Sequence, residues 1–137
     1  FAVESTLNAA EILRTCNLVV TATPSKKPIL SAFDLRPGTH ITAVGSDTPE
    51  KQELDSAILA KADLVVADSI AQCRLRGEIH KALEAGLIRE DRCIELGAII
   101  SGKAKGRTSE SQVTVVDLTG VAVQDIAIAS AVYRALK

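Results

Sequence analysis

Four short runs rich in β-branched residues, each next to a segment of helical spacing, constrain the fold of this chain more than any other feature. The runs occupy residues 17–24, 40–44, 62–68 and 113–117. Short apolar strands that alternate with helices are typical of a parallel sheet with helices on its faces. We therefore predict an α/β protein built on one parallel sheet.

Helical spacing predicts the segments between and after these strands. Ser5 and Asp55 are suited to begin helices, because short polar side chains accept hydrogen bonds from the first turn. Gly77 is expected to interrupt a helical segment and Gly86 to end it. The expected segments are helices behind Ser5, behind Asp55, at 69–85 and at 123–136, a short helix or turn at 94–100, and a polar loop at 102–112.

Composition narrows the class of protein. The chain has 137 residues, of which 47% are hydrophobic and 24% charged, as expected for one globular domain that needs no disulfide or metal to fold. A net charge of -1 and an aromatic content of 2% argue against a nucleic-acid partner, and no apolar run is long enough to cross a membrane. The three cysteines are dispersed, which favours a reducing, cytoplasmic setting.

The sequence contains no methionine and opens on Phe1. Phe1 is therefore no unprocessed translation start, and the apolar residues that follow it lead directly into a patterned segment. We expect residues 1–137 to be part of a longer protein.

The expected site lies at the carboxyl ends of the strands, where open parallel sheets bind their ligands. Asp47 follows Gly45 there, so its carboxylate can act as a general base or hold an ammonium group. From spacing alone, a turn aspartate that caps the segment after Pro49 explains the pattern equally well. The residues placed at this edge are Thr21, Thr23, Gly45, Ser46, Asp47, Asp68, Ser69, Asp117, Thr119 and Gly120.

Other constellations give weaker signals. Asp47, Asp68 and Asp117 could together bind magnesium or accept a phosphoryl group, but a capping role for Asp68 or Ser69 is favoured, and we predict no metal site. The basic loop at 101–109 lacks the order of a phosphate-binding loop. His40, His80 and Cys73 are interpreted as structural or exposed. No GxGxxG motif occurs, so at most half of a dinucleotide-binding fold is present.

Several motifs, in order along the whole chain, strongly resemble the ornithine cyclodeaminase/mu-crystallin family. The longest are VVTATPS at 19–25, LRPGTHI at 35–41, VGSDTPEKQEL at 44–54 and VDLTGVAVQD at 116–125. Shorter matches are Asp68-Ser69, Gln72, Gly77-Glu78, Glu95-Leu96-Gly97 and the segment from Gly102 to Thr108. Two departures are Glu50, where the family often has glycine, and Leu118, where many members have serine.

The resemblance implies that residues 1–137 are the carboxyl-terminal half of a Rossmann-type NAD(P)-binding domain with its closing helix. The glycine-rich loop and the substrate and dimerisation domain would precede Phe1. Asp47 would be the catalytic carboxylate, near the nicotinamide and the substrate amine. The residues implied to line the cofactor site are Thr21, Ala22, Thr23, Ala43, Val44, Gly45, Thr119 and Gly120.

The resemblance also implies NAD or NADP as cofactor, an amino-acid or cyclic imine substrate and a homodimer when the protein is complete. The leading hypothesis is a cyclodeaminase, in which hydride leaves the amino-acid α-carbon and later returns. The alternatives are a ketimine reductase, an alanine dehydrogenase or a non-catalytic mu-crystallin-like binding protein. We expect residues 1–137 alone to be inactive.

Overall fold

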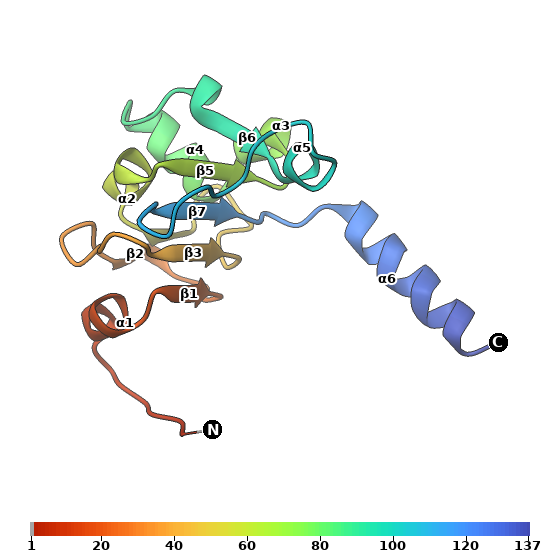
Figure 1. Cartoon of the computed structure of the whole chain (residues 1–137), viewed down its shortest axis with the longest axis horizontal. Helices are drawn as coiled ribbons and strands as arrows, with labels where there is room; N and C mark the ends of the chain where they lie inside the picture. Colours follow the sequence, from red (N-terminus) through yellow and green to blue (C-terminus); the bar gives the residue numbers. More distant parts are fainter. Residues whose placement is uncertain (1) are drawn as a thin grey trace.

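A five-stranded parallel sheet forms the centre of the protein in a computed structural model that describes residues 2–137 (Figure 1). Phe1, on which the argument about the start of the chain rests, lies outside the described residues. The strands, in their order across the sheet, are β1 (Leu18–Thr21), β3 (His40–Ala43), β7 (Thr114–Asp117), β5 (Leu64–Ala67) and β6 (Cys93–Glu95). The predicted α/β class with a parallel sheet is confirmed.

The four predicted strands correspond to β1, β3, β5 and β7, but three further strands were not predicted. β2 (Lys26–Leu30) and β4 (Gln52–Leu54) pair in parallel as a second, two-stranded sheet. β2 has four exposed residues and one buried, so it lacks the apolar pattern that marks a strand. β6 has only three residues and runs directly into α5 (Leu96–Ile100), where a helix or turn was expected.

The helices begin near the predicted positions, with one correction. Asn8, and not Ser5, caps α1 (Ala9–Thr15), because the Asn8 side chain accepts a 3.2 Å hydrogen bond from the amide of Ala10. Asp55 caps α2 (Ser56–Lys61) as predicted and accepts from the amide of Ala57 at 3.0 Å.

Gly77 interrupts the segment at 69–85 as predicted. It separates α3 (Ile70–Cys73) from α4 (Gly77–Glu84), and its φ of 92° lies in the region that side chains other than glycine rarely adopt. A Cβ at this position would lie 2.5 Å from Asp117 Oδ2. Gly77 therefore allows α4 to begin directly against the carboxyl end of β7.

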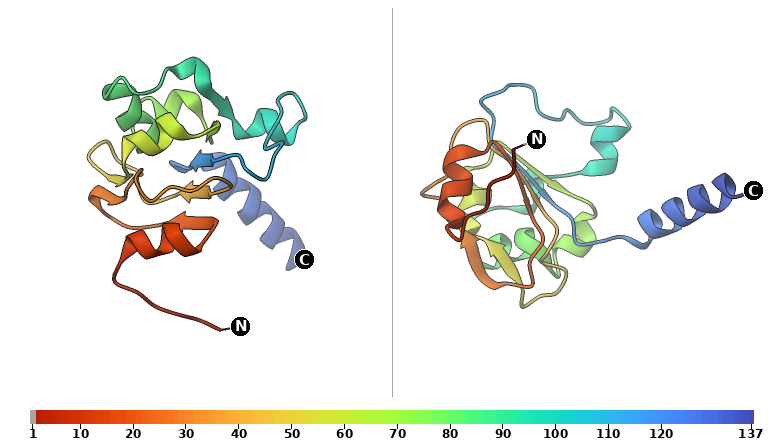
Figure 2. Two further views of the ribbon diagram at one scale, coloured as in Figure 1. Left: turned by 60° about the vertical axis from the view of Figure 1, so that its left-hand side comes forward. Right: turned by 90° about the horizontal axis from the view of Figure 1, so that it is seen from below.

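The core lies on one face of the sheet. Ile41, Val115 and Val65 lie side by side in register on β3, β7 and β5, and they belong to one buried cluster with Ile58 of α2 and Ile79 of α4. Figure 2 shows α1, α2 and α4 on this side, whereas α5 and the loop after it lie on the other. A short 3₁₀ helix (η1, Glu90–Arg92) leads from α4 into β6.

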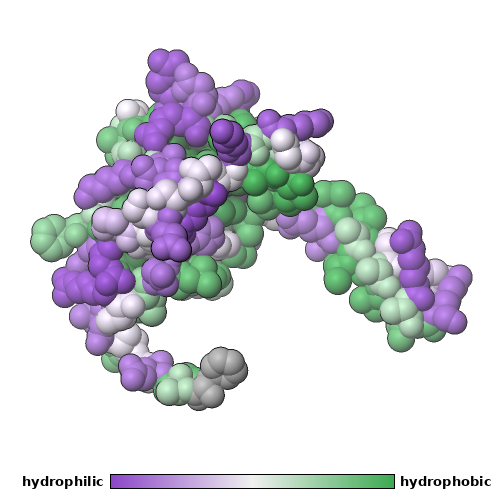
Figure 3. Space-filling view, viewed as in Figure 1, coloured by the Kyte–Doolittle hydropathy of each residue, from purple (hydrophilic) through white to green (hydrophobic). Residues whose placement is uncertain are grey.

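The last helix, α6 (Ala122–Ala135), projects away from the body of the protein (Figure 1). None of its residues is buried, and apolar side chains such as Ile126 and Ile128 are more than 60% exposed. The green surface along this helix in Figure 3 shows the same feature. Over residues 2–137, no helix has the length and apolar character needed to cross a bilayer.

Replacing Gly77 by alanine should destabilise the fold by roughly 2–4 kcal/mol. Alanine is strained at the φ of this position, and its Cβ would clash with the Asp117 carboxyl. Gly97→Ala is the matched control, since a Cβ there meets nothing within 4 Å. Urea unfolding measures both variants, and equal midpoints would contradict the prediction.

Candidate functional site

The carboxyl ends of four neighbouring strands meet at one edge of the sheet, as the sequence predicted. The backbone continues the ladder there: the Val44 amide donates to Thr21 O at 2.9 Å, and the Leu118 amide donates to Ala43 O at 2.9 Å. The Asp68 amide donates to Asp117 O at 3.2 Å. The predicted residues after β1, β3, β5 and β7 are therefore brought to one edge, here called the carboxyl edge.

Glu53 of β4 joins the ends of β1 and β3. Its carboxylate accepts hydrogen bonds from Thr21 Oγ1 at 2.8 Å, the Thr23 amide at 2.6 Å and the Gly45 amide at 2.9 Å. The side chain is fully buried. Glu53 was not singled out from the sequence, because a glutamate between Gln52 and Leu54 carries no motif beyond the family pattern.

Gly45 is needed for this contact. A Cβ at Gly45 would lie 2.3 Å from Thr23 O and 2.6 Å from Glu53 Oε1, so any side chain would push the two strand ends apart. The family resemblance implied that Gly45 lines the cofactor site. The structure adds an intramolecular reason for glycine at this position.

Asp68 and Gln72 hold the loop after β7. Asp68 accepts hydrogen bonds from Thr119 Oγ1 at 3.1 Å and from the Gly120 amide at 2.8 Å. Gln72 Nε2 donates to Thr119 Oγ1 at 2.8 Å and to Gly120 O at 2.6 Å. Asp68 thus acts across the sheet and also on its own segment, where it accepts from the Ser69 amide at 2.7 Å. The favoured capping interpretation is wrong for Ser69, which precedes α3 without a side-chain capping bond.

The predicted cofactor residues divide into a buried and an exposed set. Thr21, Ala43 and Thr119 are buried, Thr23 and Gly45 are half-buried, and Ala22, Val44 and Gly120 are exposed. The buried members lie in the interior of the protein beneath the surface of the carboxyl edge. The exposed members form the surface that a ligand can reach.

Asp47 lies just beyond β3 with 57% of its side chain exposed. Lys51 Nζ lies 2.5 Å from Asp47 Oδ1, and this hydrogen bond lowers the pKa of the Asp47 carboxyl below its usual value. Asp47 is therefore ionised at neutral pH and can hold a cationic group.

Asp117 differs from Asp47 in its environment. It is buried at the end of β7 and accepts a 2.8 Å hydrogen bond from the Ile79 amide. Burial raises the pKa of Asp117 to about 8. Within residues 2–137, no group of three or more His, Cys, Asp or Glu residues is arranged to hold a metal ion.

The histidines and the central cysteine have structural partners. His40 Nδ1 and Thr114 Oγ1 are 2.6 Å apart, and burial lowers the pKa of His40. His80 Nδ1 lies 2.8 Å from Arg74 O. Cys73 is fully buried, and burial raises the pKa of its thiol.

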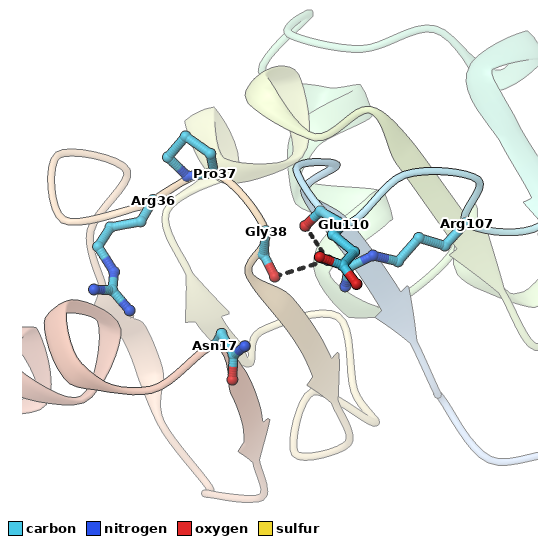
Figure 4. Close-up of a pocket in the computed structure, with 6 residues that line it drawn as sticks. All are labelled: Asn17, Arg36, Pro37, Gly38, Arg107 and Glu110. Carbon is cyan, nitrogen blue, oxygen red and sulfur yellow. Dashed lines mark hydrogen bonds between the residues drawn. The ribbon is translucent and has the colours of Figure 1, made fainter.

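A separate pocket lies at the opposite, amino-terminal end of the strands (Figure 4). Arg107 Nη2 donates to Gly38 O at 3.0 Å and to Glu110 O at 2.5 Å, so it joins the loops that precede β3 and β7. Arg107 is thus hydrogen-bonded to backbone carbonyls, and most residues of the basic loop at 101–109 are exposed. This pocket is remote from the carboxyl edge.

The model of the ornithine cyclodeaminase/mu-crystallin family matches residues 1–137. The chain belongs to this family. An uncharacterized cyclodeaminase of Sinorhizobium fredii is 47% identical over 98% of the chain and 41% of that relative. The chain thus spans about two fifths of the length of that relative.

Two solved structures of relatives share the fold. An archaeal alanine dehydrogenase dimer with bound NAD is 43% identical, with a TM-score of 0.88 over 95% of this chain and 40% of that one. The iminosuccinate reductase of Paracoccus denitrificans in complex with NAD+ is 41% identical, with a TM-score of 0.87 over 93% of this chain and 39% of that one.

The raised pKa of Asp117 predicts a pH-dependent stability. Between its unfolded value of 3.8 and its folded value of about 8, the unfolded chain loses the proton that the folded protein keeps. The contribution of Asp117 to the free energy of unfolding is fully present below pH 3.8. It falls as the pH rises to about 8, by at most about 1.4 kcal/mol per pH unit.

Asp117→Asn keeps a neutral side chain at every pH and should remove this loss. Relative to the unchanged protein, the variant should therefore gain stability between pH 5 and pH 8. Urea unfolding at both pH values measures the difference. The same difference at the two pH values would contradict the assignment.

Proposed function

We propose that this chain forms the carboxyl-terminal half of the NAD(P)-binding domain of an enzyme that oxidises an amino acid, or reduces the corresponding imine, at the α-carbon. The observation that carries the proposal is the ionised, exposed Asp47 at the same sheet edge as the loops held by Glu53 and Asp68. Support comes from the two similar structures with bound NAD, which are a dehydrogenase and an imine reductase.

The carboxyl edge fits the nicotinamide end of such a cofactor. Ala22, Val44 and Gly120 expose small or apolar groups, and no atom lies within 4 Å of a Cβ placed at Gly120. These three residues would contact the cofactor, with Thr23 and Gly45 beside them. When bound, such a cofactor would supply hydride transfer: it would accept a hydride from the substrate α-carbon or donate one to it.

Asp47 would act on the substrate nitrogen. Its carboxylate is ionised and exposed, so it can pair with a substrate ammonium or iminium group. Lys51 is the cation that Asp47 holds in this structure. A substrate cation would share or replace that partner, and the same carboxylate could accept a proton as the amine becomes an imine.

The sheet also indicates where the rest of the domain would pack. β1 lies at the edge of the five-stranded sheet, and its residues Leu18 and Val20 are more than 60% exposed. We propose that the other half of the nucleotide-binding domain, with its phosphate-binding loop, extends the sheet from β1. Residues 1–137 alone would then bind NAD weakly and be inactive.

Cyclodeamination is a second candidate, favoured by the relative of that name at 47% identity. The complete protein should be assayed with NAD and alanine or ornithine, and with NADH and cyclic imines or iminosuccinate. Formation of NADH from alanine, or its consumption by an imine, supports the dehydrogenase or reductase. Conversion of ornithine to proline with release of ammonia and no net NADH supports a cyclodeaminase. Binding of the dinucleotide without any turnover would favour a crystallin-like binding protein.

In the complete protein, Asp47→Asn should lower kcat by about a hundredfold or more, because the variant cannot neutralise the substrate cation or take its proton. Affinity for NADH should change little, since Asp47 is assigned to the substrate. Asp91→Asn is the matched control, as Asp91 is also an exposed acid paired with a basic side chain. Unchanged turnover in the Asp47 variant would remove this residue from the mechanism.

A further inference from the structure

Two buried glutamates, Glu53 and Glu78, lie in the interior next to the carboxyl edge. Glu53 and Glu78 have no exposed surface, and neither forms an ion pair in the part of the chain that the structure describes. Burying a carboxyl group is costly unless hydrogen bonds compensate it, so each should have specific donors. The donors to Glu53 are all on the segments that carry the predicted cofactor site, whereas Glu78 accepts from Ser46 and from two amides of β4.

Glu53 accepts three hydrogen bonds, from two segments of the chain. Each carboxylate oxygen accepts a backbone amide, from Thr23 on one side and Gly45 on the other, and the Thr21 hydroxyl donates to the second oxygen. The Glu53 carboxylate is fully buried and the Thr21 hydroxyl proton is already donated to it, so neither is accessible to a ligand. Their role is therefore to hold the ends of β1 and β3 at a fixed spacing.

Glu78 of α4 fixes Glu53 in turn. Glu78 accepts from the Glu53 amide at 2.7 Å and from the Leu54 amide at 3.0 Å, so β4 is locked to α4. It also accepts from Ser46 Oγ, and Ser46 is adjacent to Asp47. One chain of contacts therefore runs from α4 through Glu53 to both sides of the predicted nicotinamide site.

From this arrangement we propose that Glu53 is a positioning residue for the cofactor site: it holds Thr21, Thr23 and Gly45 so that Ala22 and Val44 present one preformed surface to the nicotinamide end of NAD(P). The proposal rests on the proposed function. It changes the role of Thr21, which the family resemblance implied as a lining residue. Thr21 is 4% exposed and acts through Glu53.

Glu53→Gln tests the proposal because glutamine cannot replace this carboxylate. Whichever way the amide is turned, its NH₂ group faces the amide of Thr23 or of Gly45. Thr21→Val removes only the hydroxyl donor, and Thr21→Ser keeps it. Asp63→Asn is the control: Asp63 also accepts a backbone amide, from Val113 at 2.7 Å, but at the amino-terminal end of the strands.

The complete protein should be titrated with NADH, and its thermal midpoint measured in parallel. We expect Glu53→Gln to raise the Kd for NADH roughly tenfold to a hundredfold, and Thr21→Val to raise it about threefold to tenfold. Thr21→Ser should restore affinity to within about twofold, and Asp63→Asn should lower the thermal midpoint without changing the Kd.

The outcomes separate the inference from the function it rests on. Unchanged NADH affinity in Glu53→Gln, with only a lower thermal midpoint, would show a purely structural glutamate and overturn the proposal. If that variant does not fold, equal affinities for Thr21→Val, Thr21→Ser and the unchanged protein would overturn it instead. Absence of NADH binding by the unchanged protein would overturn the proposed function and the role of Glu53 together.

Discussion

Hydrogen bonds from backbone amides to buried or half-buried carboxyl groups fix the positions of the loops at the carboxyl edge of this protein. Parallel strands leave their carboxyl ends as separate loops, and nothing in the ladder itself fixes where those loops go. Glu53 fixes the loops after β1 and β3, whereas Asp68 fixes the loop after β7. The edge is thereby shaped by the protein alone, and a preformed surface of this kind would lower the entropy cost of the cofactor binding proposed above.

Much of the sheet could be predicted from the sequence, because β1, β3, β5 and β7 have compact β-branched runs that point to buried parallel strands. The small second sheet could not be predicted. β2 is mostly exposed, and β4 is three residues long, so neither shows the periodicity on which such predictions depend. The choice of Asn8 over Ser5 as a helix cap also depends on tertiary position, since both residue types cap helices well.

The site was predictable in part. Topology alone places Thr21, Asp47, Asp68 and Thr119 at one edge, because each lies at or beyond the carboxyl end of a parallel strand. The role of Asp47 came from family resemblance and stays a proposal. Glu53 and Glu78 escaped prediction for a physical reason. Most of their contacts join segments 24 to 32 residues apart in sequence, which no local pattern records.

The packing of Gly45 against Glu53 has a consequence for anyone who redesigns this edge. The Glu53 side chain fills the space that a side chain at position 45 would need. A larger residue at position 45 requires a smaller one at position 53 and a shift of the Thr23 carbonyl, and the amides of Thr23 and residue 45 then need a new acceptor. The two positions form one steric unit, so mutational libraries should vary them jointly.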